Sequence, residues 1–261
     1  MNDIISALIL AIVQGIAEWI PISSSAHLVL ASRLLDFDNT LLFDVALHFG
    51  TLMAVFVYFG NDIVNILKDV LSFKFKTENG KLGVLLIIGA IPAAIFGFLL
   101  RNIVENNGDN LFLIAIGLLI TSLILFIGSM GIGKRKIGLE KLGYFGAFLI
   151  GLAQVLSLFR GISRSGGTIT SGLLLGLDMK DAVKFSFLLS IPVIFGANIV
   201  TIGNQTLPHE LLWATLVSFL VGLCMINISF KYILVNRKNL KWFGVYTLLL
   251  ALGILVYLTL R

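Results

Sequence analysis

Long apolar runs separated by short polar segments dominate the chain. Six of these runs contain about 20 mainly apolar residues, the length that an α-helix needs to cross the hydrocarbon core of a bilayer. The pattern therefore predicts an all-α polytopic membrane protein with six transmembrane helices. The predicted spans cover residues 44–60, 83–100, 111–131, 183–203, 210–230 and 241–260.

Two further apolar regions, 1–35 and 142–177, are each interrupted by a polar, serine-rich segment. We call these segments the first knot (14–27) and the second knot (159–168). The apolar halves on either side of each knot are too short to cross a bilayer. Each region is therefore predicted to form a re-entrant helix pair, which enters and leaves the membrane on the same side.

The composition agrees with a membrane protein: 58% of the residues are hydrophobic and 13% are charged. A soluble domain has about 45–50% apolar and about 25% charged residues. The net charge of +5 does not indicate a nucleic-acid partner, because the charges lie in short loops between the apolar runs. Cys224 is the only cysteine, so no intrachain disulfide is expected.

Basic residues are concentrated in three of the loops, which predicts the orientation of the chain in a cell membrane. Cytoplasmic loops carry the excess of lysine and arginine, and here those loops are 61–82, 132–141 and 231–241. Alternation of the spans then places both termini on the extracytoplasmic side. The loops expected on that side are 36–43, 102–110 and 204–209.

The two halves of the chain also resemble each other. With an offset of 140 residues, 13–16 aligns with 153–156 and 22–25 aligns with 162–165. We interpret 1–261 as one membrane domain built from two repeats, 1–131 and 142–261, of inverted topology. Inverted repeats built on broken helices place their site near the membrane midplane, where the repeats meet; chance similarity between apolar segments is the alternative.

The first knot carries an acid, a serine and a histidine at close spacing. Gln14 and Glu18 are four residues apart and share a helix face, and Pro21 is expected to end that helix near Ile20. An acid inside an apolar run indicates a functional site. Ser24 and His27 lie three residues apart, the spacing of a nucleophile and its base; helix capping by the serines 23–25 and a hydrogen-bonded core histidine are the alternatives.

The second knot places Arg164 among hydroxyl groups and glycines at membrane depth. The guanidinium presents a fork of donors that fits phosphate oxygens, and glycine lets backbone N–H groups approach an anion. A loop arginine outside the membrane is the alternative. The groups expected to bind phosphate are Arg164, Ser163, Ser165, Gly166, Thr168 and, from the first knot, Ser23.

Two polar residues near the start of the 44–60 span, Asp44 and His48, are harder to assign. We interpret them as groups that make hydrogen bonds at a helix interface. A place in the cavity wall is the alternative.

Three segments together resemble one known family, the undecaprenyl-diphosphate phosphatases. Gln14 and Glu18 match an (E/Q)xxxE motif, and 21–27 matches Pro-x-Ser-Ser-x-x-His. The second-knot segment 161–166 matches Gly-x-Ser-Arg-Ser-Gly, and 185–192 is also similar to the family. Together these motifs are specific, and the resemblance extends along the whole chain.

The resemblance implies hydrolysis of a polyprenyl diphosphate to its monophosphate, which recycles the lipid carrier of cell-wall glycan synthesis. It also implies resistance to bacitracin, a divalent-cation requirement and a site open to the extracytoplasmic side. Glu18 and Gln14 would then hold Mg²⁺ or Ca²⁺, which prefer oxygen ligands. The chain departs from the common pattern at Gln14, where many members have glutamate, and at Arg160, where bacterial members often have proline.

The resulting hypothesis gives four residues catalytic roles. Arg164 clamps the terminal phosphate, Glu18 holds the metal, and Ser24 is the nucleophile with His27 as its base. His27 as nucleophile, or as base to a water, stays open. The prenyl tail is expected to leave sideways into lipid. An inverted-repeat transporter or flippase of the same lipid is the alternative function, and a homodimer also stays open.

Overall fold

The computed structural model describes residues 3–131, 136–202 and 209–260. Most of the predicted loop 204–209, part of the loop 132–141 and the terminal residues lie outside these ranges. The described residues form helices and connecting turns without a strand, apart from one isolated parallel bridge between Ile137 and Leu177. The all-α prediction is therefore confirmed.

The predicted spans coincide with long helices. Five helical stretches of the described chain are long and apolar enough to cross a membrane, and they correspond to α3, α5, α7, α11 and α12. The sixth predicted span falls on α10, a helix that also carries charged residues in its first turns. The helices are α3 (Leu41–Tyr58), α5 (Glu78–Leu99), α7 (Leu111–Ser129), α10 (Met179–Ile202), α11 (His209–Ile228) and α12 (Leu240–Leu260).

Polar caps explain where several of these helices begin. The Thr40 side chain accepts a hydrogen bond from Phe43 N–H at the start of α3. At the start of α7, the Asn110 side chain accepts hydrogen bonds from the N–H groups of residues 112 and 113. Such caps satisfy N–H groups that have no partner inside the helix. Two shorter helices complete the connections, namely α4 (Gly60–Leu71) and α6 (Arg101–Asn107).

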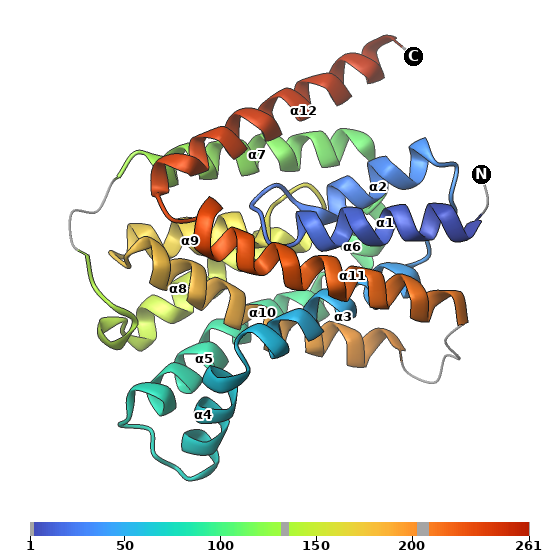
Figure 1. The fold of residues 1–261 in the computed structure, drawn as a ribbon. Coiled ribbons are helices and arrows are strands. Elements are labelled where there is room, and N and C mark those ends of the chain that lie inside the picture. Colours follow the sequence, from blue (N-terminus) through green and yellow to red (C-terminus); the bar gives the residue numbers. More distant parts are fainter. Residues whose placement is uncertain (1–2, 132–135, 203–208, 261) are drawn as a thin grey trace.

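Both interrupted regions form a helix, a break and a second helix, as the pattern predicts. The first is α1 (Asp3–Ala17) and α2 (Ser24–Leu34); the second is α8 (Tyr144–Val155) and α9 (Arg164–Leu174). Within each pair the two helices pack against each other, and the two breaks face one another inside the molecule (Figure 1). The structure thus brings the two knots together.

The ends of these helices differ in detail from the prediction. α1 ends at Ala17 and not near Ile20. The Glu18 N–H still donates to the Gln14 carbonyl oxygen at 3.0 Å, and a turn at 18–21 follows. Ser23 stands at the N-cap of α2 with a left-handed φ of 69° and makes no side-chain cap bond. Ser163, at the N-cap of α9, accepts a hydrogen bond from Gly166 N–H at 3.1 Å.

Glycines allow the helices of the two halves to approach closely. A Cβ atom at Gly50 of α3 would lie 2.4 Å from the Thr215 carbonyl oxygen of α11. One at Gly151 of α8 would lie 2.2 Å from the Gly89 carbonyl oxygen of α5. Small residues at helix interfaces are the usual basis of tight packing in membranes, because lipid gives no hydrophobic drive for association.

Candidate active site

A pocket of about 500 Å³ lies where the two knots meet. Its wall also includes the start of α3, the segment 104–109 and part of α10. Non-helical backbone at membrane depth is tolerated when it lines such a cavity. The polar residues of the wall are Glu18, Ser23, Ser24, Ser25, Asn39, Asp44, His48, Glu105, Asp109, Ser157, Arg160, Ser163, Arg164, Ser165 and Asn198.

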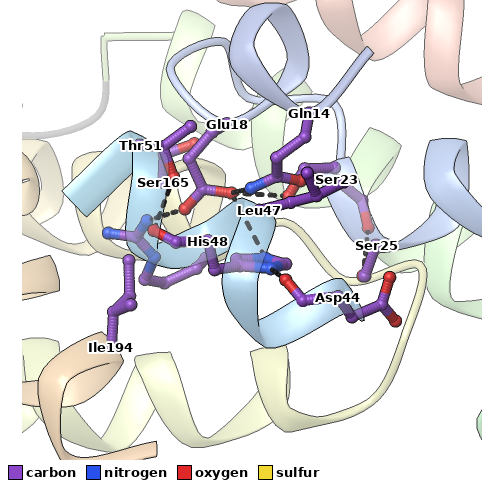
Figure 2. A network of polar contacts seen from close by, with 12 residues as sticks. Gln14, Glu18, Ser23, Ser25, Asp44, Leu47, His48, Thr51, Ser165 and Ile194 are labelled. Carbon is purple, nitrogen blue, oxygen red and sulfur yellow. Dashed lines mark hydrogen bonds and ion pairs between the residues drawn. The ribbon is translucent and has the colours of Figure 1, made fainter. Parts of the chain in front are cut away.

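Glu18 is the centre of the polar network in this pocket (Figure 2). Its Oε2 accepts hydrogen bonds from Gln14 Nε2 at 3.0 Å and from Ser24 Oγ at 2.6 Å. His48 Nε2 lies 3.6 Å from the same oxygen. The other carboxylate oxygen pairs with Arg164. A buried acid surrounded by four such groups is the arrangement expected of a functional carboxylate in a membrane.

Arg164 approaches Glu18 from the opposite knot. Its Nη2 forms the ion pair, while its buried Nη1 has no hydrogen-bond partner among the described residues. Burying a guanidinium N–H without a partner is unfavourable, so an acceptor atom within reach of this buried donor would stabilise it.

Hydrogen bonds between the knots hold this geometry. Gly161 N–H donates to Ser23 Oγ at 3.2 Å, and Thr121 of α7 bonds to the second knot on either side of Ile162. Gly161 has a φ of 99°, and a Cβ there would lie 2.4 Å from the Ile114 carbonyl oxygen. This position therefore requires glycine.

His27 does not pair with Ser24 as the spacing suggested. Its Nδ1 lies 2.8 Å from the Ser23 carbonyl oxygen and its Nε2 lies 2.7 Å from the Tyr246 hydroxyl of α12. Both ring nitrogens are thus engaged away from the serine hydroxyl, whose partner is Glu18. This placement favours a histidine that supports the Ser23 turn, and it leaves the carboxylate as the base nearest to Ser24.

The phosphate-binding candidates of the second knot divide into two groups. Ser163, Arg164 and Ser165 line the pocket. The Gly166 N–H is used by the cap of α9. The Thr168 hydroxyl contacts Ser186 of α10 at 2.6 Å. Thr168 is one turn further along α9, so its hydroxyl serves helix packing and not the pocket.

Several wall residues were not among the predicted site residues. Asp44 and His48 line the pocket, which corrects their interpretation as interface groups, and their i, i+4 spacing on α3 was the available signal. Arg160 pairs with Asp44 at 2.9 Å and with Asp109 at 3.0 Å. No spacing rule could identify these partners, since they are distant in sequence.

The pocket offers few candidate ligands for a metal ion. The described residues contain no group of three or more histidine, cysteine, aspartate or glutamate side chains that could hold one. Gln14 is fully buried and does not line the pocket, and its amide nitrogen donates to Glu18 at 3.0 Å. Its amide oxygen has no hydrogen-bond partner among the described residues. That oxygen and the Glu18 carboxylate are ligands of the kind that a hard cation prefers, and the remaining ligands would come from substrate phosphate and water.

Comparison with known proteins finds similarity along nearly the whole chain. The family model described as bacitracin resistance protein BacA matches residues 7–253. A protein of Caldicellulosiruptor bescii named undecaprenyl-diphosphatase is 43% identical over 98% of this chain and 97% of its own length. Proteins with the same name from Alcanivorax borkumensis and Korarchaeum cryptofilum are 41% and 37% identical, over 98% and 97% of this chain and 99% and 98% of their own lengths.

Proposed function

Because the chain belongs to the bacitracin resistance protein BacA family, we propose that it hydrolyses undecaprenyl diphosphate to the monophosphate and inorganic phosphate. This is a membrane phosphatase activity that recycles a lipid carrier and confers resistance to bacitracin. The relatives that are similar over their full length carry the name of this activity. Residues from the motifs of the first and the second knot line one pocket.

The observation that carries the proposal is the unpartnered Nη1 of Arg164 beside the bond between Ser24 and Glu18. A diphosphate that binds this donor brings a phosphorus atom next to the serine hydroxyl. Ser163 and Ser165 line the same part of the pocket and offer further hydroxyl donors. A fixed cation and oriented donors are the main source of catalysis in phosphoryl transfer.

In the first step, Ser24 Oγ attacks the terminal phosphorus while Glu18 accepts the hydroxyl proton over the 2.6 Å hydrogen bond. A serine–phosphorus bond forms, the bond to the bridging oxygen breaks, and the lipid monophosphate leaves. Arg164 keeps Glu18 ionised before the transfer and stabilises the charge that develops on the phosphoryl oxygens. In the second step, water attacks the phosphorus and the bond between phosphorus and Ser24 Oγ breaks. Glu18 returns its proton to Ser24 Oγ, and inorganic phosphate leaves with the oxygen of the water.

We assign the divalent cation to Gln14 and Glu18, with the substrate diphosphate as the third partner. Bound there, Mg²⁺ or Ca²⁺ would neutralise part of the diphosphate charge. Gln14 contributes its carbonyl oxygen, whereas many family members offer a carboxylate at this position. The site is therefore expected to hold the cation weakly unless substrate is present.

The proposed function is tested by the release of phosphate from undecaprenyl diphosphate by the purified protein in detergent. We expect release with Mg²⁺ or Ca²⁺, loss of release after EDTA, and recovery when the cation is restored. Phosphate release that persists in EDTA would contradict the proposed requirement for a divalent cation. Binding of the lipid by folded protein without any release would favour a carrier or flippase instead.

We further propose six transmembrane helices and two re-entrant pairs arranged as an inverted repeat, with the pocket open to the extracytoplasmic side. The packing supports this arrangement, because α1 packs on α11 while its counterpart in the other half, α8, packs on α5. The two knots also occupy equivalent places in their helix pairs.

Cysteine labelling in intact cells tests the orientation. The exposed Cys224 is first replaced by serine, and single cysteines are then placed at the exposed positions Asn107, Lys136 and Lys238. A membrane-impermeant maleimide is expected to label position 107 in whole cells, and 136 and 238 only after lysis. The opposite pattern would invert the proposed topology.

A further inference from the structure

A second hollow, of about 860 Å³, lies beside the pocket, between α2, the start of α7 and α12. We call it the lateral groove. Much of its wall is aliphatic, and its charged residues are Arg33 and the two acids of the 36–38 turn. The aliphatic wall residues are Leu30, Leu34, Leu111, Leu249, Leu250 and Ile254.

The lateral groove and the active-site pocket share a boundary. Residues 36–38 line the groove, and the next residue, Asn39, lines the pocket. Leu111 lines the groove, and Asp109 lines the pocket. Asp109 contacts both hollows: Arg33 of the groove donates to its carbonyl oxygen at 2.5 Å, and Arg160 of the pocket donates to its carboxylate at 3.0 Å.

We propose that the lateral groove holds the first isoprene units of the substrate while the diphosphate lies in the pocket. The inference rests on the proposed function, which requires a diphosphate joined to a long apolar chain. The hollow next to the phosphate site has the aliphatic wall that such a chain needs, and Arg33 of the groove contacts Asp109 of the pocket wall. The rest of the chain continues into the membrane.

The groove acts by orienting the chain more than by binding it tightly. Lipid is as apolar as a leucine wall, so a prenyl chain gains little hydrophobic free energy on moving from one to the other. What it gains is a fixed direction, which places the terminal phosphorus near Ser24. Blocking the groove should therefore reduce kcat/KM for the long-chain substrate.

Gly253 of α12 offers a way to block it. This glycine lines the groove, and a Cβ atom added there would meet no heavy atom within 4 Å. Larger side chains at this position extend into open space and leave the helix intact. Gly196 of α10 is a matched control, since a Cβ there also meets nothing within 4 Å and the residue lines neither hollow.

The first test is kinetic, with Gly253→Ala, Gly253→Leu and Gly253→Phe. We expect kcat/KM for undecaprenyl diphosphate to fall with side-chain size, by about tenfold for phenylalanine, in the range that a filled apolar subsite produces. Gly196→Phe is expected to keep the wild-type value. An unchanged kcat/KM for a folded Gly253→Phe protein, or a loss only in Gly196→Phe, would overturn the inference.

The second test is chemical and does not require hydrolysis. The photoreactive residue p-benzoylphenylalanine replaces Gly253 or Gly196, and the protein is irradiated with undecaprenyl diphosphate in phospholipid nanodiscs. We expect a prenyl lipid adduct at 253, identified by mass, and none at 196. An adduct with phospholipid alone at 253 would refute the groove, whereas loss of phosphate release by the wild-type protein would instead refute the proposed function.

Discussion

Replacement of Arg164 by alanine is expected to lower kcat/KM for phosphate release by about a thousandfold, the scale observed when a phosphoryl clamp or an oxyanion donor is removed. The guanidinium is the only group in the described part of the pocket that combines an ion pair to Glu18 with a buried unpartnered donor. The assay is phosphate release from undecaprenyl diphosphate in detergent.

A stability effect must be separated from this catalytic effect. The side chains of Arg164 and Glu18 are 13% and 5% exposed, and breaking a buried pair leaves an uncompensated charge that costs about 3–5 kcal/mol. The double variant Glu18→Gln with Arg164→Ala removes both charges. We expect it to regain thermal stability relative to Arg164→Ala and to stay inactive.

Arg164→Lys refines the same prediction. Lysine keeps the positive charge but has no planar fork, so it can pair with Glu18 or with phosphate but cannot hold both in the same geometry. We expect activity between that of the wild type and that of the alanine variant. Full activity of a folded Arg164→Ala protein would exclude the clamp. Lys238→Ala, at an exposed position outside both hollows, is the control for loss of a surface cation.

The helices and the breaks were predictable because they depend on local properties. Apolar length specifies a span, and a polar interruption in a short apolar region specifies a break, whatever the rest of the chain does. The meeting of the two knots was predicted from the interpretation of the two halves as an inverted repeat, in which opposed broken helices converge. The contact between Glu18 and Arg164 follows from that convergence.

The partners of individual side chains were less predictable. Spacing in the sequence placed His27 beside Ser24, but the histidine bonds to Tyr246, which is 219 residues away. Asp44 binds Arg160 across 116 residues. Thr168 was assigned to phosphate by its proximity to Arg164, yet the turn of α9 directs its hydroxyl to Ser186. Spacing in the sequence limits which side chains can share one face of a helix. Tertiary packing then decides which of the nearby groups becomes the hydrogen-bond partner of each side chain.

These placements change the expected role of the histidine. With Nδ1 at the Ser23 carbonyl and Nε2 at Tyr246, His27 supports the left-handed residue that begins α2. A non-glycine residue with positive φ persists only when its surroundings hold it. His27 is therefore a positioning residue in this proposal. It holds Ser23, and the proposed nucleophile is Ser24, the residue that follows Ser23.

Replacement of Ser24 by alanine is expected to abolish turnover, with a loss of at least about a thousandfold, because no other hydroxyl in the described pocket bonds to Glu18. Ser25→Ala is the matched control: Ser25 also lines the pocket, but its hydroxyl contacts Ser23 at 3.3 Å and not the carboxylate. We expect Ser25→Ala to retain most of the activity.

The covalent step separates Ser24 from the alternatives. Acid quenching of the wild-type protein during turnover should trap a phosphoryl group on the peptide that contains Ser24, and mass spectrometry should find none in Ser24→Ala. His27→Gln should still form this adduct, at a lower rate, because its role is to hold the turn. A folded Ser24→Ala protein with full turnover, beside an inactive His27→Gln, would transfer the nucleophile or base role to the histidine and leave the serine as a pocket hydroxyl.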